Sequence, residues 1–290
     1  MADVAGADQR RSAGWRVKLP DTVAWQEALA QVPGAGGRLD VQVLAGGTAN
    51  ATYRVKTGQG DFVVRLHQPY VLDLGVDRRR EAVLHAAAAA AGLASHILAA
   101  DPLGRYLVTQ FIEGAPWSAL DLDDETHLWA LAGTLRALHA LPAPQVPPLD
   151  LAMLLEGHVA QIAAQDAGAV QDLLPQVARA REILVRQGQS GRPACIVHGD
   201  LTHSNVIGAG QPRLIDWEYA AVTDPLADLA CLVAYYPQLM GRGTELLRRC
   251  GLAHSASLPE LEELAGIYRL LTNLWYRRLA LARRHPRPAH

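Results

Sequence analysis

An apolar run ends in CIVHGDLTHSN (195–205), where an aspartate and an asparagine stand five residues apart. These residues, Asp200 and Asn205, have D-x-x-x-x-N spacing, and LIDWE places a second carboxylate, Asp216, eleven residues later. One carboxylate can accept a proton from a hydroxyl group, whereas the asparagine carbonyl and the other carboxylate are oxygen ligands of the kind that Mg²⁺ prefers. Phosphoryl transfer from ATP requires both functions side by side.

A simpler explanation of HGDLTHSN is a turn rich in Asp, Asn and Ser around a buried histidine. Asp216 weighs against this alternative, because a short strand, a tight turn and a return strand would bring its carboxylate back to Asp200 and Asn205. The two motifs together therefore indicate phosphoryl transfer more strongly than HGD does alone.

Hydrophobic spacing and turn signals predict the elements that position these residues. Residues 1–20 are expected to form an N-terminal arm, residues 21–113 a small lobe of β-β-β-α-β-β order, and residues 114–290 a large helical lobe. Helices are predicted near 21–32, 77–93, 125–141, 151–165, 170–188, 225–236, 243–251 and 259–284. The predicted fold class is α+β, with a small antiparallel sheet, a helical lobe and a cleft between them.

The motif IVHGDLTHSNV followed by LIDWEYA resembles the aminoglycoside phosphotransferase and choline kinase superfamily. The DWEYA form is most similar to the bacterial choline, ethanolamine and thiamine kinase branch of that superfamily. The resemblance covers about residues 42–236 and implies a protein-kinase-like fold with ATP and Mg²⁺ as cofactors. It implies that Asp200 is the catalytic base, that Asn205 and Asp216 are the Mg²⁺ ligands, and that His198 holds the loop.

A nucleotide site is expected in the small lobe. The glycines of LAGGTANATYRV let backbone amides approach phosphate groups closely, because glycine has no Cβ. A plain hairpin would have the same sequence, but the segment resembles the GG-x-x-N loop of the superfamily. The candidates for nucleotide binding in this loop are Gly46, Gly47, Thr48 and Asn50. Backbone groups near Gln110 and Ile112 are expected to meet the adenine edge, and a core strand is the alternative there.

A cation is expected on the strand DFVVRL, where alternation puts Arg65 on one face with Val63. Protein kinases and aminoglycoside kinases have lysine at this place, but neither Lys18 nor Lys56 fits it. Arginine there resembles the choline and thiamine kinase branch, and an exposed strand arginine is the alternative. Glu81 lies on the buried stripe of the following helix and needs a partner, which makes Arg65 the obvious one. An acidic residue that stabilises the helix N-terminus is the other explanation of Glu81.

The acceptor is expected to be a small cation and not an aminoglycoside. A polycation calls for a strongly acidic cleft, but residues 232–290 contain nine arginines, four glutamates and no aspartate. Aromatic faces bind ammonium and thiazolium groups, and Tyr219 and Trp275 are the substrate-binding candidates. Core packing is the alternative for the late aromatic residues. Asp224 is expected to stabilise the pocket or the catalytic loop, and Asp228 to brace its own helix.

Bulk composition excludes other classes of function. The formal net charge of -2 gives no electrostatic case for binding nucleic acid or a membrane. The three cysteines form no CxxC pair and the N-terminus lacks a signal peptide, which predicts a cytoplasmic protein. The sequence does not predict an oligomeric state. The predicted function is an ATP- and Mg²⁺-dependent kinase acting on a hydroxyl of an amino alcohol or thiamine-like substrate. The alternatives are an aminoglycoside or sugar phosphotransferase of the same fold, or a non-catalytic small-molecule-binding member.

Overall fold

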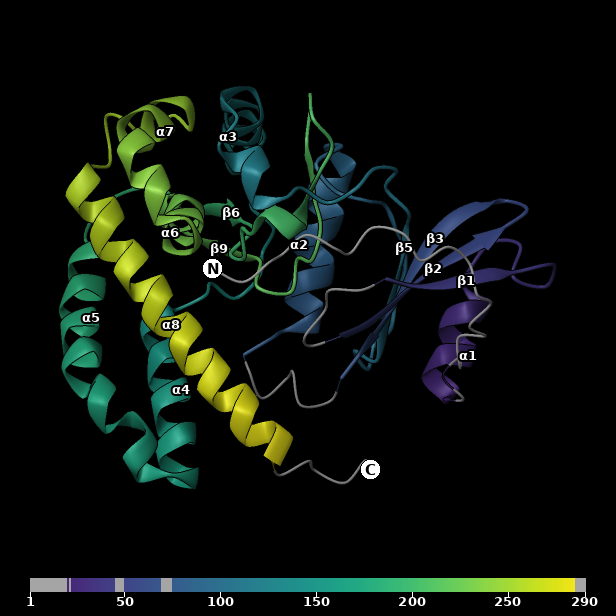
Figure 1. Ribbon diagram of the computed structural model, residues 1–290, viewed down its shortest axis with the longest axis horizontal. Helices are drawn as coiled ribbons and strands as arrows, with labels where there is room; N and C mark the ends of the chain where they lie inside the picture. Colours follow the sequence, from purple (N-terminus) through teal and green to yellow (C-terminus); the bar gives the residue numbers. More distant parts are fainter. Residues whose placement is uncertain (1–19, 21, 45–49, 69–74, 285–290) are drawn as a thin grey trace, which may run out of the picture.

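The structure is a computed structural model, and it describes residues 20, 22–44, 50–68 and 75–284. A five-stranded antiparallel sheet and two helices form a small lobe, and helices form most of a larger lobe (Figure 1). The chain crosses from one lobe to the other after the last strand of the sheet. The α+β fold class predicted from the sequence is therefore confirmed.

The sheet of the small lobe has the strand order β1-β2-β3-β5-β4, and every neighbouring pair is antiparallel. Its strands are β1 (Asp40–Leu44), β2 (Asn50–Thr57), β3 (Gly60–His67), β4 (Ile97–Ala100) and β5 (Tyr106–Gln110). Alternation along β3 buries Phe62 and Val64 against α1 (Val23–Ala30). Arg65 lies on the opposite face, which is turned toward the large lobe, since its guanidinium reaches Asp216.

Helix α2 (Arg78–Ala90) lies against the face of the sheet that carries Arg65. The side chain of Asp77 caps its N-terminus, accepting hydrogen bonds from the backbone N–H groups of Arg79 and Arg80, both at 3.0 Å. This cap fixes where α2 starts, and its first turn therefore faces the junction between the lobes.

The large lobe consists of helices around an insertion of short strands. Its helices are α3 (Glu125–His139), α4 (Leu151–Gln165), α5 (Leu174–Gln187), α6 (Leu226–Tyr235), α7 (Gly243–Arg249) and α8 (Leu258–Arg284). In the insertion, β6 (Cys195–Val197) pairs with β9 (Ala221–Thr223), and β7 (Val206–Ile207) pairs with β8 (Arg213–Leu214). The helix bounds lie within a few residues of the predicted ones, except that a 3₁₀ helix, Ala167–Leu173, occupies the predicted start of α5.

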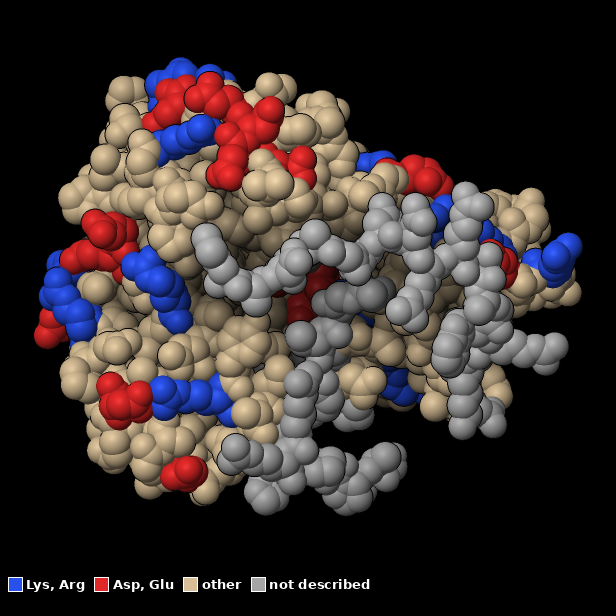
Figure 2. All heavy atoms as spheres, in the orientation of Figure 1, with Lys and Arg blue, Asp and Glu red and all other residues tan. Residues whose placement is uncertain are grey.

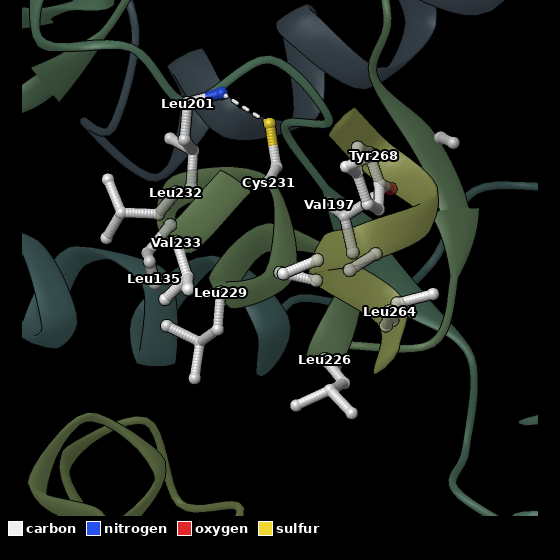
Figure 3. Close-up of a cluster of buried hydrophobic side chains, with 14 of the residues drawn as sticks. Leu135, Val197, Leu201, Leu226, Leu229, Cys231, Leu232, Val233, Leu264 and Tyr268 are labelled. Atoms are coloured by element: carbon white, nitrogen blue, oxygen red, sulfur yellow. Dashed lines mark hydrogen bonds between the residues drawn. The ribbon is translucent and has the colours of Figure 1, made fainter. Parts of the chain in front are cut away.

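The core of the large lobe forms directly beneath the HGD segment. Figure 3 shows Leu229 and Val233 of α6 in a buried cluster with Val197 and Leu201, the residues on either side of HGD. The sulfur of Cys231 accepts a hydrogen bond from the backbone N–H of Leu201 at 3.3 Å (Figure 3). Because both flanking residues are closely packed, the loop between them is held at its two ends.

The longest helix, α8, has 27 residues and packs across α4, α5 and α6 (Figure 1). It carries charged residues on its outer face, among them Arg277, which forms an ion pair with Asp172. In the ranges that the structure describes, no helix is both long enough and apolar enough to cross a membrane.

Candidate active site

The HGD segment leaves β6 and turns sharply at Gly199. This residue has φ 77°, and a Cβ here would lie 2.4 Å from the backbone oxygen of Tyr219, so only glycine fits. The buried ring of His198 is held on both sides. Its Nε2 lies 2.9 Å from the backbone oxygen of Ile215, and its Nδ1 accepts from the backbone N–H of Asp200 at 3.3 Å. These contacts tie the HGD loop to the LIDWE segment.

Asp228 on α6 braces the HGD loop, contrary to the expectation that it braces its own helix. Its fully buried carboxylate accepts hydrogen bonds from the backbone N–H groups of His198 and Gly199, at 3.0 and 2.9 Å. Asp224 was expected near the loop, but its carboxylate bonds to Arg192 at 2.8 Å instead. The two acids stand in one segment, TDPLADLA, and only their burial in the fold decides which of them reaches the loop.

Asp200 has both carboxylate oxygens engaged by neighbours. Its Oδ1 accepts from the hydroxyl of Tyr235 at 3.2 Å, and its Oδ2 accepts from Nδ2 of Asn205 at 3.1 Å. Burial, and to a smaller extent the charge of Glu218, raise the pKa of Asp200 to about 6. The group is therefore ionised at neutral pH, yet it binds a proton more readily than an exposed aspartate does, which suits a general base.

Asp216 enters the site in a left-handed conformation, with φ 63°, and is the sole non-glycine residue with positive φ in the described ranges. This conformation costs about 1 kcal/mol or more for such a residue, and outliers of this kind gather at functional sites. Oδ1 of Asp216 accepts from Arg65 at 2.7 Å, and Arg65 also donates to Glu81 on α2. The structure thus places the carboxylate and the strand arginine in contact.

The ion pairs keep Arg65 and Glu81 charged although both are buried. Burial lowers the pKa of Arg65, but the charges of Glu81 and Asp216 outweigh it and hold the pKa above its ordinary value. Burial likewise raises the pKa of Glu81, and the charges of Arg65 and Arg78 outweigh that effect and lower it to about 2. Removing Glu81 would leave Arg65 paired with Asp216 alone, and removing Arg65 would leave Glu81 paired with Arg78 alone.

Glu218 and Arg78 also belong to the site, although the sequence analysis gave them no role. Glu218 is 5 % exposed, and its Oε2 accepts from Asn50 at 2.9 Å and from Arg78 at 3.3 Å. Arg78 also donates to Glu81 at 2.7 Å, so it links both lobes. Burial and the charge of Asp216 raise the pKa of Glu218 to about 7. The position of Glu218 inside LIDWE was the available signal, whereas the run of three arginines at residues 78–80 is typical of a solvated helix start.

A first cavity, of about 350 Å³, lies between the sheet and the segments 204–207 and 215–217, and we call it the sheet-side cavity. Its lining includes Asn50, Arg65, Gln110, Ile112, Asn205 and Asp216. The backbone N–H of Gln110 is bonded to the backbone oxygen of His96 at 2.9 Å, so this donor is not available to an adenine ring.

A second cavity, of about 270 Å³, lies against α4, α6 and α8, and we call it the helix-side cavity. Its lining includes Asp200, Glu218, Tyr219, Tyr235 and Trp275. Nε1 of Trp275 donates to the hydroxyl of Tyr219 at 2.5 Å, which satisfies both polar groups. Figure 2 shows one face of the molecule, with acidic atoms recessed in a hollow near its middle. On the outer surface of this face, acidic and basic side chains lie near one another.

The two cavities share one boundary, and it is the place where the predicted site residues gather. Four residues line both cavities: Asn50, Ser204, Asn205 and Asp216. Of the sequence-predicted residues, Glu81 lies behind Arg65 and lines neither cavity. The predicted loop residues Gly46, Gly47 and Thr48 lie outside the described residues.

Asn205 and Asp216 offer a donor set that fits Mg²⁺. The Nδ2 group of Asn205 donates to the backbone oxygen of Asp200 at 2.8 Å, which leaves its Oδ1 as an acceptor. Arg65 occupies Oδ1 of Asp216, and Oδ2 remains. Among the described residues, His, Cys, Asp and Glu form no group of three that could hold a metal ion. Mg²⁺ is commonly bound by one or two protein ligands together with phosphate oxygens and water, so this small set suits it.

The fold and this arrangement of residues define a kinase-like phosphotransferase. Residues 40–278 match the phosphotransferase enzyme family, and the chain belongs to this family. The superfamily expected from the HGD and DWE motifs is therefore confirmed. No curated protein matches the chain.

Solved structures with the same fold include kinases of different acceptors. A choline/ethanolamine kinase family protein from Mesorhizobium loti is 24% identical, with a TM-score of 0.67 over 92% of this chain and 89% of that chain. A choline kinase from Streptococcus pneumoniae is 20% identical, with a TM-score of 0.66 over 87% and 88%. An ADP-bound aminoglycoside phosphotransferase is 16% identical, with a TM-score of 0.58 over 85% and 86%. At these identities the likeness establishes the fold.

Proposed function

We propose that the protein is an ATP- and Mg²⁺-dependent kinase that phosphorylates a hydroxyl of a small amino alcohol or a thiamine-like molecule. The observation that carries the proposal is the meeting of Asp200, Asn205 and Asp216 where the two cavities join. A donor nucleotide in one cavity and an acceptor in the other would face each other across these three side chains.

The sheet-side cavity suits the nucleotide. Its described lining includes the apolar side chains Val63 of β3 and Leu107 of β5, and it carries one cation, Arg65, next to Asp216. Arginine binds phosphate oxygens through a planar fork and stays charged at every working pH. Two structures of the same fold hold a nucleotide, a choline kinase with AMP and an aminoglycoside phosphotransferase with ADP. They support nucleotide binding by a protein of this fold, and the lining of the sheet-side cavity is the reason for placing ATP there.

Asn205 and Asp216 are the proposed Mg²⁺ ligands. Each would bind the ion through the oxygen that its own hydrogen bonds do not occupy, Oδ1 of Asn205 and Oδ2 of Asp216. Bound there, the ion would neutralise charge on the transferred phosphoryl group and the departing phosphates. Arg65, held between Glu81 and Asp216, would add a fixed positive charge on the nucleotide side.

Asp200 is the proposed base. Tyr235 and Asn205 fix its two oxygens, and a lone pair remains to accept a hydrogen bond from the acceptor hydroxyl. The hydroxyl proton passes to Asp200 as the oxygen forms its bond to the γ-phosphorus. The bond from that phosphorus to the bridging oxygen breaks, and ADP leaves. Positioning and charge stabilisation supply most of the rate in such a transfer.

The helix-side cavity suits a compact cationic acceptor. Its carboxylates, Asp200, Asp216 and Glu218, lie together at the shared boundary, and its described lining contains no lysine or arginine. The ring faces of Tyr219 and Trp275 can contact an ammonium or thiazolium group near the reacting hydroxyl. An aminoglycoside carries ammonium groups over several rings and would find carboxylates at one end only. The charge distribution therefore favours an amino alcohol.

An acceptor panel tests the proposal. Purified protein is incubated with MgATP and choline, ethanolamine, thiamine, glucose or kanamycin, and both ATP consumption and phosphorylated product are measured. We expect product from at least one of the first three acceptors. Turnover of kanamycin alone would favour the aminoglycoside alternative. Tight binding of a small molecule without phosphoryl transfer to any acceptor would favour the non-catalytic alternative.

A further inference from the structure

A third side chain, besides the two carboxylates, holds Arg65. Its Nε–H donates to Nε2 of His67 at 3.2 Å, while NH1 donates to Asp216 and NH2 to Glu81. A guanidinium has five N–H groups. In the contacts that the structure describes, these bonds leave one N–H on each terminal nitrogen for a phosphate. Each partner thus fixes a different nitrogen of the same planar group.

The second contact of His67 determines what its ring can do. Nδ1 lies 2.9 Å from the backbone oxygen of Gly104, which can only accept, so Nδ1 carries the hydrogen and Nε2 presents its lone pair. Burial lowers the pKa of His67 to about 3, and the charges of Arg65 and Arg78 act in the same direction. The backbone N–H of His67 is also bonded, to the oxygen of Arg105 at 2.8 Å. The ring is therefore a neutral, fixed acceptor.

We propose that His67 is a positioning residue for Arg65, and that it serves the arginine in particular. Where arginine has its Nε–H, a lysine has a methylene group, so His67 would have nothing to accept from a lysine on this strand. The two residues lie two positions apart on one face of β3, which brings the ring alongside the guanidinium. The proposal rests on the proposed function, because it concerns how Arg65 meets the nucleotide phosphates.

The physical reason is the burial of Arg65, which is 8 % exposed. Without the ring of His67, its Nε–H would be buried and unpaired, which is unfavourable. The guanidinium would turn to recover a partner, and the two remaining N–H groups would no longer be aligned for phosphate. Loss of the ring should therefore weaken the binding of ligands that carry phosphates and leave the adenine site intact.

Binding of ATP and of adenosine, measured by calorimetry, tests the inference. His67→Leu should raise the Kd for ATP about tenfold and leave the Kd for adenosine within about twofold. His67→Gln should bind ATP within about threefold of wild type, because the amide oxygen can accept from Nε and the amide N–H₂ can donate to the Gly104 oxygen. His96→Leu, at an exposed histidine of the same lobe, is the matched control and should change neither Kd.

A double-mutant cycle separates positioning from a general effect on the fold. In an Arg65→Lys background, His67→Leu should weaken ATP binding by less than about twofold, because the interaction that it removes is already gone. Equal losses in both backgrounds would overturn the proposal, as would wild-type ATP binding by His67→Leu or an equal loss for ATP and adenosine. If the wild-type chain bound no ATP at all, the proposed function would fail first, and this inference with it.

Discussion

The two cavities that share Asn205 and Asp216 differ in electrostatic character. The described charged lining of the sheet-side cavity consists of Arg65 and Asp216, which neutralise each other. The helix-side cavity has three carboxylates and, in its described lining, no lysine or arginine. A polyanionic donor and a cationic acceptor would therefore be sorted to opposite sides of one boundary. The proposed acceptor preference rests on the charge of the cavity and not on that of the chain, whose formal net charge is only -2.

The difference also appears in the pKa values. On the sheet side, ion pairs lower the pKa of Glu81 to about 2 in spite of its burial. On the helix side, burial and mutual repulsion raise the pKa of Asp200 to about 6 and that of Glu218 to about 7. The buried charges on the sheet side are compensated by ion pairs and stabilise the fold. On the helix side, ionisation of the buried carboxylates opposes folding. Stability and reactivity are thus divided between the two sides.

The largest expected effect comes from changing Asp200, the proposed base, on the helix side. Asp200→Asn should lower kcat about 10³-fold, because general base catalysis contributes on this order, and should leave the Kd for ATP within about twofold. Steady-state kinetics with the best acceptor of the panel and calorimetry with ATP measure the two effects. Asp123→Asn, at an exposed aspartate away from both cavities, is the control. Wild-type kcat in Asp200→Asn would mean that another group accepts the proton.

Changing Arg65, the cation on the sheet side, should affect ATP binding and leave acceptor binding almost unchanged. Arg65→Lys keeps the charge opposite Glu81 but loses the planar fork, so the KM for ATP should rise about thirtyfold while the acceptor KM stays within about twofold. Initial rates with each substrate varied in turn measure this separation. A similar rise in both KM values would show that the two cavities do not act as separate donor and acceptor sites.

The pH profile sharpens the comparison through the carboxylates. Asp200 must be ionised to act as a base, so kcat/KM should fall as the pH drops below about 6. Glu218, whose pKa is raised to about 7, is itself mostly protonated at that pH, so Glu218→Gln, which mimics the protonated acid, should leave this acid limb nearly in place. Profiles of both proteins between pH 5 and about pH 9 measure any shift. An acid limb that moved to clearly lower pH in Glu218→Gln would show that Glu218 is still ionised when Asp200 binds its proton.

The smallest expected effect is on stability. The pKa of Asp200 is raised from 3.8 to about 6 in the folded chain, so its ionisation opposes folding as the pH rises through this range. Asp200→Asn should consequently raise the melting temperature by about 2 °C at pH 8, and this gain should vanish near pH 4. Thermal unfolding at both pH values tests the prediction. A lower melting temperature at pH 8 would show that the ionised group stabilises the fold.

The local sequence was sufficient to predict how the residues in spaced motifs come together. The predicted loop, strand, turn and return strand do bring Asp200, Asn205 and Asp216 to one place, because a short β-hairpin fixes which residues of its two strands lie opposite each other. Strand alternation in the same way places Arg65 on the face that meets α2. These relations extend over a few residues or one turn, and the sequence displays them directly.

Contacts between elements that are far apart in the sequence could not be predicted from local sequence patterns. Arg78 and Glu218 are 140 positions apart, and only the docking of α2 on the LIDWE segment joins them. Asp224 precedes α6 and Asp228 lies within it, and the packing of α6 against the HGD loop, which the local sequence does not specify, decides which of them reaches the loop. The three-residue strand β9 was missed because so short an apolar run has no period of its own.

The C-terminal arginines do not bear on the choice of acceptor, although the acceptor expected from them is kept in the proposed function. Arg277 pairs with Asp172 and Arg248 pairs with Glu245 on the surface, and no arginine of residues 232–284 is in the described lining of either cavity. The net charge of a segment therefore does not predict the charge of the cavity that the segment helps to form. The carboxylates at the shared boundary are the relevant evidence.

The most direct test of the central claim is the mass of an acceptor recovered after incubation with MgATP. Wild-type and Asp200→Asn proteins are compared side by side, with ATP binding of both confirmed by calorimetry. The account predicts that wild type adds one phosphoryl group to an amino alcohol or to thiamine, and that the variant binds ATP but adds almost none. Equal phosphorylation by the variant, or phosphorylation of kanamycin alone, would contradict it.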